Sequence, residues 1–306
     1  MPKVLLELNK SVVYKQIEKE LGKTRDEIES DVNIIQEWLD TQPHLPEKPS
    51  AELIQSFLLF NKFSIERAKQ KLDMYYTIRG HLPEMFSKHP CSLDMEKQAR
   101  ISYVIPLPKF SQDCRRVIYS KFSEELNAEN IHFDRFVCHI FNVFEIMLRE
   151  DLFLGAHFIF DCNNFKLAFM TRMNPMVIKK ASVVMEKVFS NRVTSINIVN
   201  YRSSFETMLN LMMNLLPEKV RSRIQVHKDS EALFKVFPKE ILPKDVGGDE
   251  DSLGELTELW IQKLKENKDL FDQLGTMRVD ESKRPTKLVN DDVLGFYGNF
   301  KKLDVD

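Results

Sequence analysis

Apolar residues recur at helical spacing through the first 90 residues of the chain. Thr24 and Glu27 form a capping box, which predicts that a helix begins near Arg25. Ser50 and Ser64 each precede another segment with the same spacing, and prolines separate the segments. The pattern predicts a small helical module over residues 1–90.

From about residue 95 the pattern changes to short apolar runs that are rich in β-branched and aromatic residues. These runs predict strands at residues 101–107, 116–122, 156–161, 195–200 and 223–227. Segments of helical spacing lie among them, at residues 131–150, 174–190 and 203–216. Strands that alternate with helices indicate an α/β sheet. We expect a sheet-containing domain over residues 91–250, then a C-terminal helix and a surface-draped tail over residues 251–306.

Neither the net charge nor the cysteine pattern changes the predicted α/β fold. Lys and Arg number 44 and Asp and Glu 46, so the formal net charge is −2 and nothing indicates a nucleic-acid partner. No run of 18 apolar residues occurs, and Glu7 interrupts the apolar start, so we expect neither a membrane span nor a signal peptide. The four cysteines contain no CxxC pair, which favours free thiols in a reducing, cytoplasmic setting.

Motifs for catalysis are missing. The chain has no GxGxxG, GxxxxGK[ST], GxSxG or HExxH, and its seven histidines show no ligand spacing. His139 and His157 lie among phenylalanines, which is typical of core histidines. We therefore expect no enzymatic activity, no cofactor and no metal.

The segment 203–216 carries a broad apolar stripe that contains several methionines. Such a helix either packs into a core or closes over a lipophilic ligand, and the spacing alone does not separate the two. Lys219, Arg221 and Arg223 follow directly; in a helical turn Lys219 and Arg223 would share one face, away from Arg221. These cations are either solvated or bind an anionic lipid headgroup.

Several blocks of the chain together resemble the CRAL-TRIO family, which includes the cellular retinaldehyde-binding and α-tocopherol transfer proteins. The blocks are SFLLFNKFSIERAKQKLDMYYTIRGHLPEMF, GAHFIFDCNNF, MEKVFSNRVTSINIVN, FETMLNLMMNLLPEKVRSRIQVH and ILPKDVGG. They cover residues 25–250; the tail is similar to insect members, and the α-tocopherol transfer type is nearest. The resemblance implies a helical lead-in followed by a lipid-binding domain with a mixed or parallel sheet, a hydrophobic pocket and a mobile lid helix.

The resemblance also implies a function. The family carries one lipophilic molecule between sheet and lid, and its tocopherol-transfer members bind phosphatidylinositol bisphosphates through a basic patch. Residues at matching positions of that patch are Arg192, Lys219 and Arg223, beside Arg221. Leu59 stands where the family usually has Arg, Thr194 replaces a basic residue, and Arg202 replaces a proline before the lid.

We therefore predict a monomeric intracellular lipid carrier that contacts membranes through anionic phosphoinositides. With the pocket between sheet and lid that the resemblance implies, and with strand alternation limiting the choice, the predicted pocket wall comprises Phe158, Phe160, Val184, Met185, Phe189, Ile196, Ile198, Phe205, Met208, Leu209 and Met212. Cys138, Asn142 and His139 are candidate partners for a polar group of the ligand. The ligand stays open among tocopherol, retinoid, carotenoid, another isoprenoid and phospholipid. Two alternative functions remain open: a lipid-modifying enzyme and an adaptor with a vestigial pocket.

Overall fold

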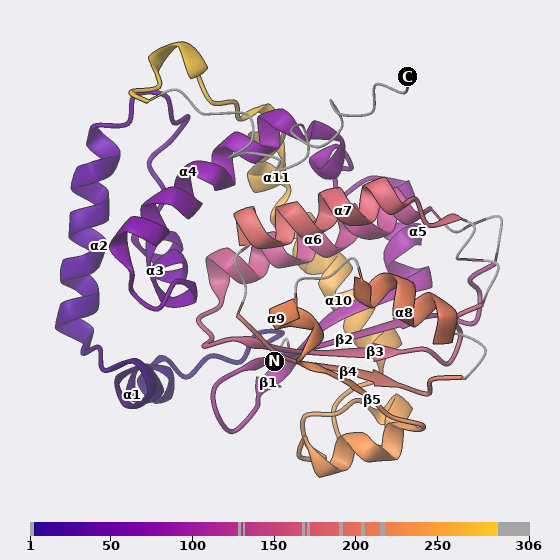
Figure 1. Ribbon diagram of the computed structural model, residues 1–306. Helices are drawn as coiled ribbons and strands as arrows, with labels where there is room; N and C mark the ends of the chain where they lie inside the picture. The colour runs from indigo at the N-terminus through magenta and orange to yellow at the C-terminus, as the bar shows by residue number, and fades with distance from the viewer. Residues whose placement is uncertain are drawn as a thin grey trace, which may run out of the picture.

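The computed structural model describes residues 3–286, apart from 128–129, 131, 167–168, 170–171, 190–191, 203–205 and 215–217. The first elements are helical: α1 (Lys10–Leu21), α2 (Arg25–Asp40), α3 (Ala51–Phe60), α4 (Ile65–His81), the 3-10 turn η1 (Pro83–Phe86) and α5 (Leu93–Ile101). Figure 1 shows α1 to α4 gathered to one side of the sheet. The predicted helical module is confirmed.

The capping box forms as predicted at the start of α2. The Thr24 hydroxyl accepts a hydrogen bond from the Glu27 amide at 3.3 Å, and the Glu27 carboxylate accepts one from the Thr24 amide at 2.8 Å. The next helix, α3, is buried at seven of its ten positions because it packs between α2, α4 and the long helix α6 (Phe133–Glu150). This burial makes α3 the centre of the helical module.

The sheet contains five strands in the order of the chain. They are β1 (Ser102–Phe110), β2 (Arg116–Phe122), β3 (Ala156–Asp161), β4 (Val193–Val199) and β5 (Ile224–Val226). The first two strands are antiparallel and every later pair is parallel, so the predicted mixed sheet is confirmed. The connections between the parallel strands are helical, as crossovers require.

The helices between β2 and β5 cover one face of the sheet (Figure 1). Besides α6 they are α7 (Pro175–Val184), which continues into the π-helical segment η3 (Met185–Phe189), α8 (Glu206–Asn214) and the short α9 (Glu218–Arg221). The opposite face meets the chain after β5, where the Phe237 ring lies 5.3 Å from the His157 ring. Helix α10 (Leu253–Glu266) packs against β1 and α5.

The C-terminal part contains more structure than the pattern predicts. Short 3-10 turns are η5 (Ser230–Lys235), η6 (Lys244–Val246) and η7 (Glu281–Lys283). Helix α11 (Lys268–Thr276) is not among the predicted helices, and it buries Phe271 and Leu274. Leu270, Phe271 and Leu274 recur at helical spacing, but the segment has only nine residues and falls within the predicted tail.

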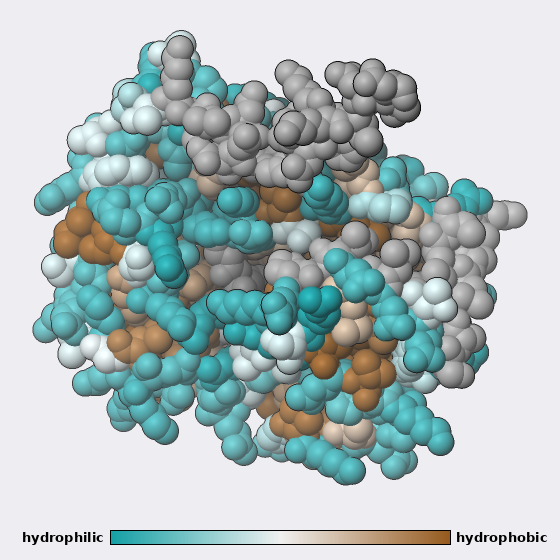
Figure 2. Space-filling view, in the orientation of Figure 1, coloured by the Kyte–Doolittle hydropathy of each residue, from teal (hydrophilic) through white to brown (hydrophobic). Residues whose placement is uncertain are grey.

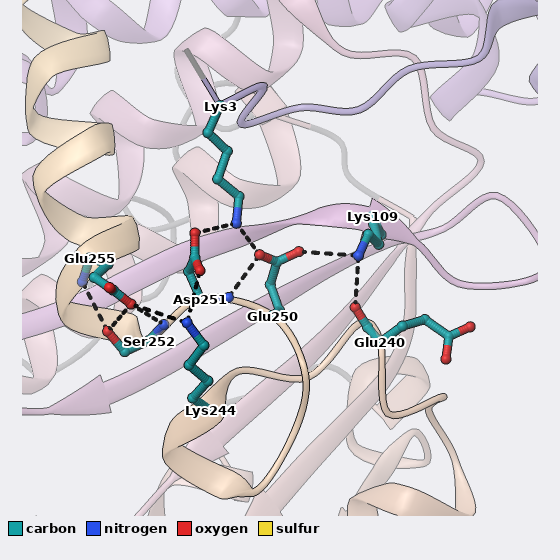
Figure 3. Close-up of polar contacts among 8 residues, drawn as sticks. All are labelled: Lys3, Lys109, Glu240, Lys244, Glu250, Asp251, Ser252 and Glu255. Atoms are coloured by element: carbon teal, nitrogen blue, oxygen red, sulfur yellow. Dashed lines mark hydrogen bonds and ion pairs between the residues drawn. The ribbon is translucent and has the colours of Figure 1, made fainter. Parts of the chain in front are cut away.

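A cluster of ion pairs ties the start of the chain to the junction before α10 (Figure 3). The Lys3 ammonium pairs with Glu250 and lies 2.6 Å from the Asp251 carboxylate. Glu250 is buried, and Lys109 at the end of β1 lies 3.7 Å from its second oxygen. Because both cations face one buried carboxylate, the cluster holds three distant segments together.

Candidate functional site

One face of the sheet is apolar along three adjacent strands. Phe158 of β3 pairs with Ile196 of β4, and Phe160 pairs with Ile198. The rings of Phe158 and Phe160 stack with centroids 6.3 Å apart, and Ile159 between them is buried on the other face. The alternation predicted for these strands is thus present, and four predicted wall residues share one surface.

This surface is incompletely covered. Phe158, Ile196 and Ile198 are less than 10% exposed, but Phe160 is 39% exposed although it belongs to the central strand. Val226 in β5, beside Ile198, is 46% exposed. Figure 2 shows apolar surface at this β5 edge of the sheet, among mostly hydrophilic surroundings. Large apolar side chains at such positions are normally buried, so the surface is unusual.

Aromatic rings connect this surface to α6 and η3. Phe144 of α6 lies 6.2 Å from Phe158 and 5.8 Å from Phe189, measured between ring centroids. Phe189 and Val184 are fully buried, and Met185 is half-buried at the start of the π-helical segment. Phe189 therefore joins the predicted wall through Phe144.

Helix α8 stands where the resemblance places a lid. Leu209 is half-buried and lines a hollow of about 640 Å³ with seven other residues: Tyr201, Glu206, Asn210, Met213, Val226, His227 and Lys228. Phe205 lies outside the described residues, and so do the side chains of Met208 and Met212. For these three residues the pocket assignment stays a prediction.

Asn200 and Asp161 form a hydrogen bond in the segment that precedes α8. Asn200 adopts a left-handed backbone conformation with φ of 57°, which Asn tolerates better than most residues. Its amide donates to Asp161 at 2.7 Å, and the Tyr119 hydroxyl donates to the other oxygen of Asp161 at 2.9 Å. The middle of β2 and the ends of β3 and β4 are thereby joined just before Arg202, which is exposed.

The polar candidates on α6 already have protein partners. The Cys138 thiol donates to the Met85 carbonyl at 3.3 Å, and the Asn142 amide donates to the Lys88 carbonyl at 3.1 Å. Burial raises the pKa of Cys138 to about 11 and lowers that of His139 to about 4, so both are neutral near pH 7. His139 is 4% exposed, as expected of a core histidine. Contact of Cys138 or Asn142 with a ligand stays a prediction.

Arg192 is paired with a carboxylate of the N-terminal helix. Its guanidinium donates to Glu20 of α1 at 3.0 Å, and Arg115 donates to the same carboxylate at 2.9 Å. Neither Arg115 nor Glu20 is marked by any motif, and only folding brings them to Arg192. The neighbouring Arg223 guanidinium donates to the Val193 carbonyl, so Arg192 and Arg223 lie at the same end of β4.

The remaining basic candidates follow α8. Lys219 is exposed and Arg221 is half-buried. Helix α9 ends at Arg221, so Arg223 lies beyond it, and the shared helical face expected for Lys219 and Arg223 is absent. The cause is β5, which begins at residue 224 and draws the chain into the sheet. Leu59, where the family usually has Arg, is fully buried in α3 and packs in the core.

Comparison with known proteins assigns this architecture to a class. Residues 24–95 match the family model of the Pinta-like UBA domain, and residues 101–248 match the CRAL/TRIO domain. Both matched regions carry the elements described above. The chain therefore contains a CRAL/TRIO domain at residues 101–248, preceded by a Pinta-like UBA domain at residues 24–95.

Individual relatives are distant. Clavesin-1 of Rattus norvegicus, of Pongo abelii and of Mus musculus is each 22% identical to the chain over 233 residues. The alignment covers 75% of this chain but 66% of these relatives, so the chain spans just under two-thirds of their length. A solved structure of Sfh5 aligns with 85% of this chain and 100% of its own at 13% identity, with a TM-score of 0.43, which is too low to carry an argument.

Membrane-spanning helices and metal sites are features of other classes of protein. Within the described ranges, no helix is both long and apolar enough to cross a bilayer. In the same part of the chain, no three His, Cys, Asp or Glu side chains lie together as metal ligands would. All four cysteines are free.

Proposed function

We propose that the chain is a non-enzymatic carrier that binds one hydrophobic lipid between the sheet and α8 and transfers it between membranes. The observation that supports this most is the exposure of Phe160 in the central strand, 39%, beside the buried side chains of Phe158, Ile196 and Ile198. A ligand that buries about 400 Å² of apolar area would gain ~10 kcal/mol before association costs. That gain is sufficient for stable carriage without an ion pair.

The proposed ligand is α-tocopherol-like or another isoprenoid. The sheet side of the proposed site is apolar, with Phe158, Phe160, Ile196 and Ile198, while the polar residues Glu206, Asn210, His227 and Lys228 line the open hollow beside α8. On α6, Cys138 and Asn142 already donate to backbone carbonyls. A ligand with few polar groups suits such a wall better than one with several, because each unpaired polar group would lose its hydrogen bonds to water.

Membrane contact is the second part of the proposal. Arg192, Lys219 and Arg223, with Arg221, would hold the headgroup of an anionic phosphoinositide and so bring α8 to the bilayer, where the ligand is released. We further propose that the carrier is a cytoplasmic monomer. In it, residues 1–90 support the lipid-binding part at 91–250, and the described C-terminal residues 251–286 pack against both.

A matched pair of substitutions tests the pocket. Phe160→Asp places a carboxylate on the proposed wall, whereas Phe234→Asp makes the same change at a phenylalanine of similar exposure, 38%, in η5. Binding of a fluorescent α-tocopherol analogue should weaken about tenfold or more in Phe160→Asp, because burying a carboxylate against a lipid costs several kcal/mol. It should change little in Phe234→Asp.

Two results would contradict the proposal. Equal binding by both variants and the wild type, with unchanged thermal melting, would show that Phe160 does not face the ligand. Equal weakening by both variants would mean that the probe binds exposed apolar surface rather than a pocket.

A further inference from the structure

A second cavity lies away from the apolar face of the sheet. It has a volume of about 220 Å³ and forms where the end of α4, the segment after it, α6 and α11 meet. Phe141 lines it, and the Phe141 ring also packs on Phe189, with centroids 5.5 Å apart. The cavity therefore adjoins the back of the proposed lipid site without being part of it.

Positive charge dominates the lining of this cavity. Arg79, Lys88 and Arg278 line it, and Glu145 is the one carboxylate among its lining residues. Glu145 is shared, because Arg79 donates to one oxygen at 2.6 Å and Arg149 donates to the other at 2.8 Å. One carboxylate thus faces two guanidiniums, and within the described residues neither Lys88 nor Arg278 forms an ion pair.

The buried guanidinium of Arg79 indicates most strongly that the cavity lacks a hydrogen-bond partner. Its side chain is 5% exposed and is held between the rings of Tyr75 and Phe86, at 4.6 and 4.4 Å from their centroids. The Nε atom is buried and has no hydrogen-bond partner in the described structure. Buried guanidinium donors are rarely left unpaired, because an unsatisfied buried donor loses its hydrogen bonds to water without replacement.

The rest of the lining is largely apolar. Phe86, Phe141, Phe271 and Leu274 contribute rings and a branched chain, and the nearby His89 lies 3.3 Å from the Asp272 carboxylate. The volume equals that of about seven water molecules and falls below the roughly 300–1,000 Å³ of pockets for drug-sized ligands. The fitting ligand is therefore small.

We propose that this cavity binds a small organic carboxylate. The carboxylate would lie towards Arg79, Lys88 and Arg278, where charge-assisted hydrogen bonds are strong, and its compact apolar body would pack on Phe86, Phe141 and Phe271. This site is separate from lipid carriage and does not depend on it.

Calorimetric titration of the purified full chain with benzoate tests the site, with benzamide as the neutral molecule of the same shape. Benzoate should bind at least about tenfold more tightly than benzamide, because only benzoate pairs with the cations. Lys88→Gln and Arg278→Gln should each weaken benzoate binding severalfold, and the double variant more than either. Lys97→Gln, an exposed lysine outside the cavity, should leave it unchanged.

Several results would overturn the proposal. No benzoate binding, or equal binding of benzoate and benzamide, would show that the cavity does not select a carboxylate. Benzoate binding that is lost in Phe160→Asp but unchanged in the Lys88 and Arg278 variants would assign it to the lipid site. Equal loss in all three lysine and arginine variants would reflect net charge alone.

Discussion

Arg116 and Asp151 form an ion pair in which neither side chain is exposed. Two parallel hydrogen bonds of 2.8 Å join them, and Arg116 also donates to the Leu107 carbonyl at 2.9 Å. Removing one charge from such a pair leaves the other buried without a counter-ion. Asp151→Asn should therefore lower the free energy of unfolding in urea by about 3–5 kcal/mol.

A surface pair provides the control for this prediction. Asp40 pairs with Lys48, and both side chains are more than half exposed. Asp40→Asn removes the same charge but should lower the free energy of unfolding by less than about 1 kcal/mol. Similar losses in the two variants would show that the Arg116–Asp151 pair adds nothing beyond an ordinary surface contact.

The buried side chain of His139 should make the free energy of unfolding depend on pH. Burial lowers its pKa from 6.5 to about 4, so between these values the unfolded chain binds a proton that the folded chain does not. Stability should therefore fall as the pH drops through this window, by about 3 kcal/mol from this residue. The free energy of unfolding of His139→Leu should fall less steeply over the same pH range. His132→Leu, at an exposed position, should keep the wild-type slope.

A slope for His139→Leu as steep as that of the wild type would mean that carboxylates alone cause the acid sensitivity.

His139 was predicted as a core residue from its phenylalanine neighbours, and the structure confirms it. By contrast, nothing in the sequence near Arg116 indicates burial, because charged residues are normally exposed and its partner lies 35 positions away.

Secondary-structure elements were predictable where periodicity was strong. The five strands and the helices α2, α3, α4, α6, α7, α8 and α10 occur close to the predicted ranges. Helices α1, α5 and α11 were not predicted individually. In α5 charges are distributed along nine residues and the buried face includes Gln98, so no apolar stripe is visible. In α11 the stripe of Leu270, Phe271 and Leu274 is present but short, and such a helix depends on packing for its stability.

Helix α1 provides a prediction about membrane contact. Glu20 pairs with Arg192 and Arg115, so it competes with any anionic headgroup for these cations. Glu20→Gln should strengthen binding to vesicles that contain phosphatidylinositol bisphosphate by about fivefold, since it frees Arg192 and one cation contributes about 1 kcal/mol. Arg115, by contrast, keeps its pair with Asp113. The gain should shrink as salt rises past about 0.15 M. Vesicle co-sedimentation across a salt series measures this.

Glu18→Gln is the matched control, because it removes the same charge from an exposed position of the same helix. It should strengthen vesicle binding less than Glu20→Gln does. Equal gains would indicate a general effect of net charge. No gain in Glu20→Gln, together with unchanged binding in Arg192→Ala, would show that this end of β4 does not contact anionic lipid.

At the scale of the whole molecule, the candidate site is only partly visible in the sequence. Alternation along β3 and β4 predicts which side chains share a face, because that information is local. The pairing of Glu20 with Arg192 joins residues 172 positions apart, and no local pattern reports it. The exposure of Phe160 likewise depends on how α8 lies over the sheet, which periodicity does not specify.

The central claim is that the folded chain holds a lipid. The most direct measurement is organic extraction of the purified, monodisperse wild-type chain followed by mass spectrometry, with an equal amount of Phe160→Asp as the blank. The account predicts about one molecule of a single hydrophobic lipid class per wild-type chain, recovered chemically unchanged, and little from the blank. An empty extract from well-folded wild-type protein, or the same lipids in equal amount from both, would contradict it.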